Sequence, residues 1–323
     1  MIKKKLLLAC LCTAVLTGCG NRNEDMPESA ALSGVEEHEA EAGESADAEK
    51  DTEGSMSEGA EHEAANAEED MEGSVSAGAE HETEAGETAD AVFTFGDKAT
   101  MNNQVNGREL PIYCVDTEEK KVALSFDAAW GNEDTEELLS ILEAHDLHVT
   151  FFMTGGWVEN YPEDVKAILA AGHDLGNHSE NHKNMSELSD EEKKEEILSV
   201  HRKVKDITGY DMFLFRPPYG DYDNALIDVL KDCEYYGIQW DVDSLDWKNE
   251  GVDAILETVT KHKNLGNGSI ILCHNGGEYT AEALDALIIE LEAQGYEIVP
   301  VSELIYPDNY HMDVQGRQIA DES

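Results

Sequence analysis

The sequence predicts an α/β protein in which β-strands and helices alternate from about residue 121 to residue 301. Short apolar runs typical of buried strands recur along this region, and a stretch with helical spacing follows nearly every one. Polar residues come directly after several of these runs. The alternation implies a parallel sheet with helices outside it, and about seven such units favour a barrel over an open sheet.

The elements can be placed along the chain in order. The predicted strands cover residues 122–126, 149–154, a short stretch at Leu175, 213–215, 236–240, 269–273 and 297–301. The predicted helices cover residues 135–144, 162–171, 189–208, 224–233, 252–262 and 281–294. Ser189 and Glu192 form a capping box at the start of the long helix. The barrel domain is thus expected over residues 121–306.

The segment before the barrel, residues 92–120, is predicted to lead into it as a hairpin. The apolar runs at 111–115 and 121–126 flank an Asp-Thr-Glu-Glu turn, which is the expected pattern for two antiparallel strands. Residues 307–323 form a polar tail to which the sequence assigns no function.

Charge limits the possible partners. The chain of 323 residues has 71 acidic and 22 basic residues and a formal net charge of −49. A polyphosphate would be repelled by such a chain, so the sequence argues against nucleic acid as a partner. The 24 acidic and 5 basic residues of positions 1–91 account for part of this excess, and the rest of the chain is acidic too.

Residues 1–19 have the pattern of an export signal. Lys3, Lys4 and Lys5 precede an apolar run at 6–16 that is too short to span a bilayer comfortably. The run ends in Leu16-Thr17-Gly18-Cys19, which resembles the bacterial lipobox. This resemblance implies lipidation of Cys19 and a location at the extracellular face of the cytoplasmic membrane; the alternative is an ordinary signal peptide with an incidental Cys.

Residues 20–91 are predicted to be a disordered acidic spacer between membrane and wall. They consist mainly of Glu, Ala, Gly, Ser and Asp, and the stretch 37–45 returns nearly unchanged at 80–88. Such a composition buries too little apolar surface to offset the entropy lost on ordering.

A histidine pair follows the short strand at Leu175. His178 and His182 stand four residues apart, and on a helical turn such positions share one face. Two neutral imidazoles on one face can bind a divalent metal. Two unrelated polar side chains are the alternative reading of this spacing.

Further polar residues follow other predicted strands, where the loops of a barrel carry its chemistry. Each has a plainer alternative: Asp127 as a helix cap, Arg216 in a structural ion pair, Asp246 in an acidic surface loop, and His274 as a core histidine. Trp247 lies in the same loop as Asp246, and Trp is seldom found in a plain surface loop.

Together these motifs resemble the polysaccharide deacetylases with a NodB homology domain, carbohydrate esterase family four, in particular the subgroup associated with peptidoglycan and sporulation. The resemblance covers residues 121–304. The motifs occur in the family's order: Phe126-Asp127, His178-x-x-x-His182, Arg216-Pro217-Pro218-Tyr219-Gly220, Asp243-Ser244-Leu245-Asp246-Trp247 and Leu272-x-His274.

The resemblance implies a distorted (β/α)7-8 barrel and a role for each residue. His178 and His182 would hold a divalent metal, usually Zn²⁺, with Co²⁺, Ni²⁺ or Mn²⁺ as alternatives. Asp127 would be the general base, held by Arg216, and His274 the general acid, oriented by Asp246. The backbone N–H of Tyr219 would bind the oxyanion, and Trp247 and Leu272 would line the pocket for the acetyl methyl group.

One position departs from the family pattern. Many members have a second Asp directly after the base, where it completes the metal site, and this chain has Ala128 there. Another oxygen could supply the third bond, or binding could be weak, or catalysis could be lost. We expect a weakened but working site.

The expected function is hydrolysis of N-acetyl groups of peptidoglycan N-acetylglucosamine or N-acetylmuramic acid by a monomer, through attack of a metal-bound water on the amide carbonyl. The alternatives are a glycan-binding pseudoenzyme and a deacetylase of chitooligosaccharide or acetylated xylan. Replacing Arg216 by Ala is expected to lower the rate without unfolding the domain.

Overall fold

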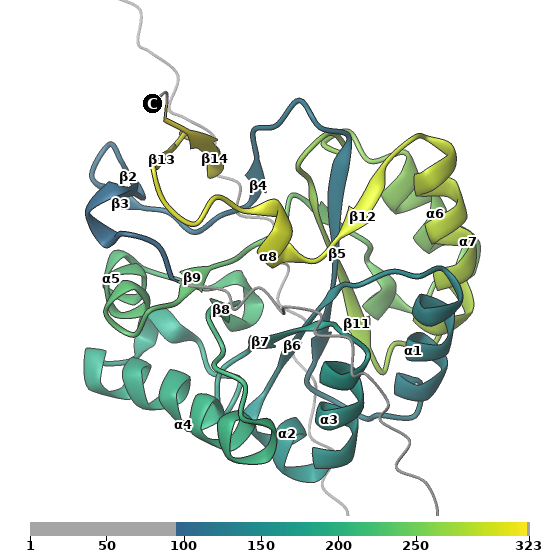
Figure 1. The fold of residues 1–323 in the computed structure, drawn as a ribbon, viewed down its shortest axis with the longest axis horizontal. Coiled ribbons are helices and arrows are strands. Elements are labelled where there is room, and N and C mark those ends of the chain that lie inside the picture. The colour runs from purple at the N-terminus through teal and green to yellow at the C-terminus, as the bar shows by residue number, and fades with distance from the viewer. Residues whose placement is uncertain (1–94, 322–323) are drawn as a thin grey trace, which may run out of the picture. The chain divides into compact units, whose positions relative to one another are not determined.

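The computed structural model describes residues 95–321, and within them eight parallel strands form one curved sheet (Figure 1). Its strands lie in the order β10 (Val242–Asp243), β11 (Ile270–Asn275), β5 (Lys121–Ala128), β6 (Thr150–Met153), β7 (Asp174–Asn177), β8 (Leu214–Phe215) and β9 (Tyr236–Gly237), and β12 (Glu297–Val299) also pairs with β5. No pairing among the described residues joins the edge strands β9 and β10. The predicted fold is therefore confirmed, as a distorted barrel.

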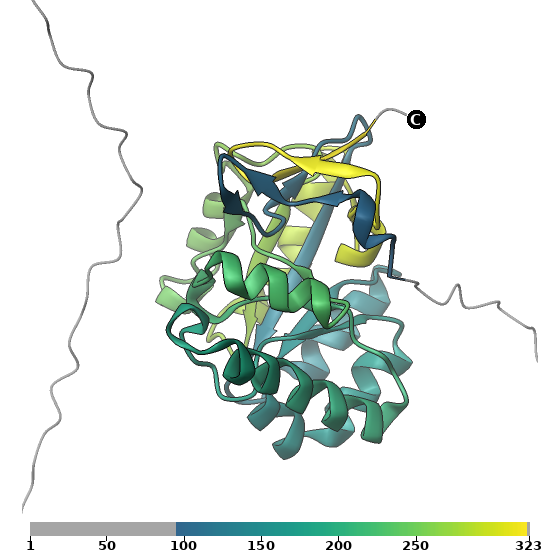
Figure 2. The same ribbon diagram turned by 90° about the vertical axis from the view of Figure 1, so that its left-hand side faces the viewer.

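Helices cover the outside of this sheet (Figure 1, Figure 2). They are α1 (Thr135–Ala144), α2 (Gly155–Asn160), α3 (Pro162–Ala170), α4 (Asp190–Thr208), α5 (Asn224–Asp232), α6 (Val252–Thr260) and α7 (Thr280–Ala293). The short helix α8 (Val301–Leu304) instead packs in a separate apolar cluster that includes Ala123 of β5. Short 3-10 turns are η1 (Lys98–Thr100), η2 (Met185–Glu187), η3 (Pro218–Gly220) and η4 (Asp246–Lys248). The predicted capping box of α4 is present, and Gly209, with a φ of 80°, ends this helix in the left-handed conformation.

Strand β5 shows how the sheet separates the outer core from the barrel interior. Its outer-core residues, which pack with apolar residues of the helices, are Val122, Leu124, Phe126 and Ala128. Ala123 belongs to a second apolar cluster inside the barrel. Because side chains alternate along a strand, Ser125 and Asp127 share the inner face with Ala123. The strand thus delivers the Asp127 carboxylate to the interior at its carboxyl end.

A second, smaller sheet is built from both ends of the described chain. Its strands lie in the order β1 (Met101–Asn102), β13 (Tyr310–Met312), β14 (Arg317–Ala320) and β4 (Cys114–Val115), and β2 (Gln104–Val105) pairs with β3 (Arg108–Glu109) beside it. Residues 307–321, which the sequence analysis set apart as a polar tail, are therefore part of the fold.

The predicted hairpin between residues 111–115 and 121–126 is wrong. Strand β4 pairs with β14 in parallel and not with β5. The backbone N–H of Ile112 donates to the Gly237 carbonyl, and that of Val115 donates to the Gly268 carbonyl. The segment thus bridges β9 and the start of β11, and these contacts satisfy backbone groups that a hairpin would otherwise have paired.

The predicted export signal, spacer and lipidation site at Cys19 lie outside the described residues and stay predictions. Within residues 95–321, no helix combines the length and the apolar character needed to cross a bilayer.

Candidate active site

The predicted site residues meet at the carboxyl ends of the barrel strands. Asp127 and His274 are register partners on the neighbouring parallel strands β5 and β11, so their side chains lie side by side on the inner face. His178 follows β7, Arg216 follows β8, and Asp246 begins η4 after β10. Two strands, β5 and β11, and three loops that follow strands thus contribute to one site.

Asp127 and Arg216 form a buried ion pair. Arg216 Nη1 lies 2.7 Å from Asp127 Oδ1, and Asp127 is only 5% exposed. Although burial alone would raise the pKa of Asp127, the nearby Arg216 guanidinium lowers it below its ordinary value. The carboxylate is therefore ionised at neutral pH, and Asp127 Oδ2 remains for other partners.

Arg216 reaches Asp127 across the barrel interior and is itself completely buried. Its guanidinium carbon lies 4.1 Å from the centre of the Phe152 ring on β6, and Nη2 donates to Ser125 Oγ at 2.8 Å. Ser125 Oγ in turn donates to the Ile271 carbonyl. Arg216 is thus packed into the core as well as paired with the carboxylate.

His274 and Asp246 form the second pair of the site. His274 Nδ1 lies 2.6 Å from Asp246 Oδ1, and the His274 backbone N–H and Thr280 Oγ1 both donate to Asp246 Oδ2. Burial alone would lower the pKa of the His274 imidazole, but its hydrogen bond to Asp246 raises this pKa above the ordinary value. The pair therefore favours a protonated imidazole whose Nε2 is free to donate a proton.

His178 and His182 are brought together by a loop, so the helical turn expected for them is wrong. His182 has a φ of 53°, outside the right-handed helical range. Their Nε2 atoms nevertheless lie 3.2 Å apart. His178 Nδ1 lies 2.8 Å from the Arg216 carbonyl oxygen, which can only accept, so Nδ1 carries the proton and Nε2 presents its lone pair.

This pair suits a divalent cation. Two nitrogens bound at about 2.0–2.1 Å to a tetrahedral ion would be separated by about 3.3 Å, close to the observed distance. Burial lowers the pKa of His178 to about 4 and also lowers that of His182, so both rings are neutral at neutral pH. Asp127 Oδ2 lies 3.5 Å from His178 Nε2.

A complete set of protein ligands is missing from the described residues. Residues 95–321 contain no group of three or more His, Cys, Asp or Glu side chains placed to hold a metal ion. Ala128 is fully buried among the outer-core residues and offers no oxygen from its side chain. The structure thus presents two imidazole ligands, with Asp127 as the nearest carboxylate.

Three predicted residues, Tyr219, Leu272 and Trp247, are not members of these pairs. Tyr219 has a φ of 59°, and its exposed ring packs edge-on against the His182 ring at 4.6 Å between centroids. Leu272 is buried two residues before His274, on the same face of β11. Trp247 is half exposed with Lys248 over its ring, so its place in an acetyl pocket stays a prediction.

Trp130 is a site residue that the sequence analysis did not select. Its exposed ring lies 5.4 Å from the His274 ring and 6.4 Å from the His182 ring, between centroids. The ring therefore lies within reach of both His274 and His182. The only signal in the sequence was its position three residues after Asp127, which does not show on which side the ring lies.

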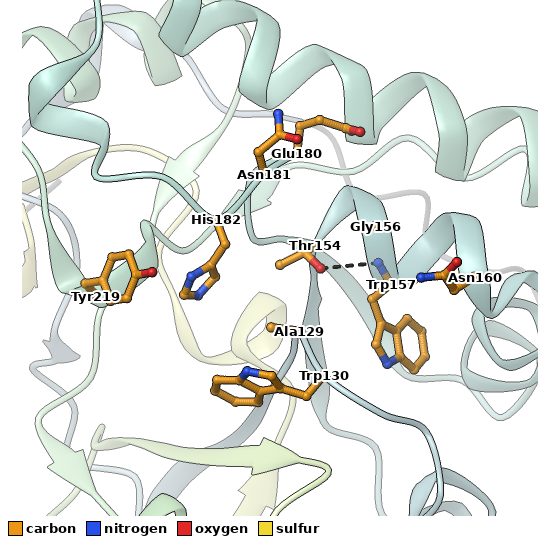
Figure 3. A pocket seen from close by; sticks show the side chains of 10 residues that line it. All are labelled: Ala129, Trp130, Thr154, Gly156, Trp157, Asn160, Glu180, Asn181, His182 and Tyr219. Carbon is orange, nitrogen blue, oxygen red and sulfur yellow. Dashed lines mark hydrogen bonds between the residues drawn. The ribbon is translucent and has the colours of Figure 1, made fainter. Parts of the chain in front are cut away.

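A cleft of about 430 Å³ opens beside this site (Figure 3). Its lining residues, drawn in Figure 3, are Ala129, Trp130, Thr154, Gly156, Trp157, Asn160, Glu180, Asn181, His182 and Tyr219. The lining combines aromatic rings with amide side chains, which is a composition suited to a sugar ring with its hydroxyl groups.

Comparisons with known proteins agree with the motifs. The polysaccharide deacetylase family profile matches residues 115–238. A peptidoglycan-N-acetylglucosamine deacetylase of Bacillus cereus is 37% identical over 196 residues, which cover 59% of this chain and 91% of that protein. The uncharacterized protein YlxY of Bacillus subtilis is 35% identical over 195 residues, which cover 60% of each chain.

A solved structure with the same fold is described as a pseudoenzyme. BA3943 of Bacillus anthracis, a CE4 family pseudoenzyme, is 32% identical with a TM-score of 0.58, covering 66% of this chain and 73% of that one. A mutant of BA3943 with restored enzymatic activity is 36% identical, with a TM-score of 0.59 over 61% of this chain and 71% of that one. From the motifs, the barrel and these likenesses together, the chain belongs to the polysaccharide deacetylase family.

Proposed function

We propose that this protein removes N-acetyl groups from cell-wall glycan, with peptidoglycan N-acetylglucosamine or N-acetylmuramic acid as the substrate unit. The observation that carries the proposal is the placement of Asp127 beside His274, each held by its own buried partner. An ionised carboxylate and a protonated imidazole at one carbonyl are the base and the acid that amide hydrolysis requires.

The residues divide the reaction between them. Asp127 accepts the proton of the attacking water, and Arg216 keeps the carboxylate ionised and in place. His274 donates its Nε2 proton to the departing amine, because an amine leaves poorly without one. The backbone N–H of Tyr219 donates to the oxyanion that forms when the water adds to the carbonyl.

A metal would be held by His178 and His182, most simply as Zn²⁺, with Co²⁺, Ni²⁺ or Mn²⁺ as alternatives. The chemistry it supplies when bound is polarisation of the amide carbonyl and acidification of a water. Because Asp127 Oδ2 is the nearest carboxylate oxygen to the pair, the same side chain has to be shared between proton transfer and any contact with the ion.

Metal removal tests the proposal directly. Acetate released by the full chain from peptidoglycan fragments and chitooligosaccharides is measured with zinc, with chelator, and after zinc is restored. We expect release to fall by at least tenfold in chelator and to return with zinc, because the amide carbonyl would lose the polarisation that a bound ion supplies. An Asp127→Asn variant is the control, and release equal to that of wild type in this variant would contradict the assigned base.

A glycan-binding pseudoenzyme is the second candidate function. The incomplete ligand set and the likeness to BA3943 favour it. This candidate predicts glycan binding without acetate release from any substrate by a folded protein, with no difference between wild type and Asp127→Asn.

Asp246 should set the alkaline limit of activity. The reaction needs His274 protonated, so the rate falls as pH rises through the raised His274 pKa. An Asp246→Asn variant lacks the carboxylate that raises the His274 pKa, so this pKa should fall. We therefore expect the alkaline limb of kcat/KM against pH to move to lower pH. A limb at the same pH in both proteins would show that His274 is not the acid.

For location, we propose that the protein is anchored through a lipid on Cys19, at the extracellular face of the cytoplasmic membrane. The residues Leu16-Thr17-Gly18-Cys19 after an apolar run support it, as does a glycan substrate that lies outside that membrane. A Cys19→Ala variant is then expected to leave the membrane fraction, and equal membrane retention of both proteins would refute the anchor.

A further inference from the structure

The loop between the two histidines is held in an unfavourable backbone conformation. Ser179 has a φ of 65° and His182 a φ of 53°, both in the left-handed region. A non-glycine residue in a sparsely populated region costs on the order of 1–3 kcal/mol and persists only when its surroundings hold it there. The distance between the two Nε2 atoms therefore depends on contacts made by the loop.

Contacts within the loop hold only part of it. The Ser179 N–H donates to Asn177 Oδ1, and the His182 N–H donates to Ser179 Oγ, each at 3.0 Å. These bonds shape the turn, but they connect it only to residues of the turn itself and to the end of β7. They leave the direction of the turn to be fixed from outside.

Two kinds of external contact do this. The Gly155 N–H at the start of α2 donates to the Ser179 carbonyl at 3.0 Å, and Glu196 on α4 binds the residues that follow. Glu196 Oε2 accepts the Asn181 N–H at 2.7 Å, and Oε1 accepts Asn181 Nδ2 at 2.8 Å. Lys183 Nζ also lies 2.9 Å from Oε1. Although burial alone would raise the pKa of Glu196, the Asn181 side-chain hydrogen bond lowers it. An ionised, buried carboxylate is thus bound to the residues on both sides of His182.

Lys203 supports the loop from the same face of α4, two helical turns further along. Its Nζ lies 2.5 Å from Glu180 Oε1 and 3.0 Å from Glu159 Oε2 at the end of α2. The two central residues of the loop, Glu180 and Asn181, therefore both bind to α4. One long helix with a capping box is a rigid base for such contacts.

We infer that α4 presets the metal-binding geometry of the histidine pair and that Glu196 is its main positioning residue. The inference rests on the proposed function in that it takes the pair to be a metal site. An ion held by only two protein side chains has few other protein contacts that contribute to its affinity. Its affinity therefore depends strongly on whether the two imidazoles already lie at the binding distance and need no rearrangement. Loss of Glu196 frees the residue before His182 and lets the pair separate.

The test compares Glu196→Ala and Glu196→Gln with wild type and with Glu195→Ala, all in the full chain. Glu195 is the neighbouring, exposed residue, and its carboxylate contacts Ser199 and Arg202 of its own helix, so it is a matched control. Cobalt affinity is measured by visible absorption, and zinc affinity by competition with a chelating dye. Melting temperature is recorded for each variant.

We expect affinity about 10–100-fold weaker in Glu196→Ala, as for other residues that orient metal ligands. Glu196→Gln should fall between Ala and wild type, since its carbonyl oxygen still accepts from Asn181, and Glu195→Ala should match wild type. Equal affinity of the Glu196 and Glu195 variants would overturn the inference. If Glu196→Ala does not fold, Glu196→Gln decides alone, and affinity equal to that of wild type overturns it.

Two further outcomes separate this inference from the proposed function. Wild type that binds neither cobalt nor zinc overturns the inference, whatever its acetate release. Affinity that falls in the Glu196 variants, while no protein of the series releases acetate, supports the inference and contradicts the deacetylase activity.

Discussion

An Ala128→Asp variant is expected to bind zinc at least ~10-fold more tightly than wild type, because a carboxylate adds an anionic oxygen ligand to two imidazoles. Ala128 is fully buried, so the new carboxylate is costly unless an ion or a proton neutralises it. In chelator the melting temperature should therefore fall below that of wild type, and zinc should restore it. Scanning calorimetry with zinc and with chelator measures both effects.

Ala129→Asp is the matched control for this experiment. Ala129 is the next residue, is only half-buried and lines the cleft. A new carboxylate there is solvated and should change melting temperature little. If Ala128→Asp loses stability equally with and without zinc, the new carboxylate stays in the outer core, where the Ala128 side chain lies, and does not complete the metal site. Acetate release that rises with zinc in this variant would make Ala128 the cause of a weakened enzyme.

An Arg216→Ala variant is expected to lose both activity and stability. The sequence alone predicted a lower rate without unfolding, but complete burial of Arg216 changes that expectation. Removing one partner of a buried ion pair costs on the order of 3–5 kcal/mol, since Asp127 is left charged without a partner. Acetate release should fall by roughly 10²–10⁴-fold, the usual contribution of a positioned general base. Denaturant unfolding and acetate release measure the two losses.

A double variant separates the two roles of Arg216. In Arg216→Ala/Asp127→Asn no charge is left unpaired, so its loss of stability should be smaller than the sum of the two single losses, while activity stays absent. Arg202→Ala, which removes an exposed Arg from α4, should change stability by only about 0.5 kcal/mol or less. Equal stability of Arg216→Ala and Arg202→Ala would mean that the buried pair is not important for the fold.

The side-by-side placement of Asp127 and His274 could be anticipated from the sequence. Both follow short apolar runs, and parallel strands of a barrel end at the same rim. Alternation along β5 and β11 then turns both side chains inward. Pattern and topology are enough here because each strand has only two faces, and most residues of the outer face are apolar.

The local conformation of the histidine loop could not be anticipated. A spacing of four residues is also the helical spacing, and the sequence alone does not distinguish the two. The loop has positive φ values at Ser179, whose N–H donates to Asn177 Oδ1, and at His182, whose N–H donates to Ser179 Oγ. Glu196, which accepts the N–H of Asn181 between them, lies on a helix outside the motifs. Helix α2 was missed for a related reason: Gly155 and Gly156 at its start disfavour helix, and Thr154 caps it nonetheless.

The hairpin predicted between residues 111–115 and 121–126 was wrong for a reason that also applies to the histidine loop. In both cases the partners that determine the conformation lie far away in the chain. Local turn residues between 115 and 121 suggested pairing of the flanking runs. The backbone of residues 112–115 instead pairs with Gly237, Gly268 and β14, which no local pattern indicates. Such long-range backbone pairing outweighs the turn propensity of a short local segment.

The small sheet formed by β1, β13, β14 and β4 constrains the order of folding. Residues 114–115 pair with residues 317–318, and residues 101–102 pair with residues 310–311, so both ends of the domain close one sheet. During synthesis, β1 and β4 therefore have no partner in this sheet until residues 310–318 have left the ribosome. Closing a loop over most of a domain slows folding. Until this closure, β1 and β4 expose unpaired strand edges, and correct folding requires that they do not aggregate.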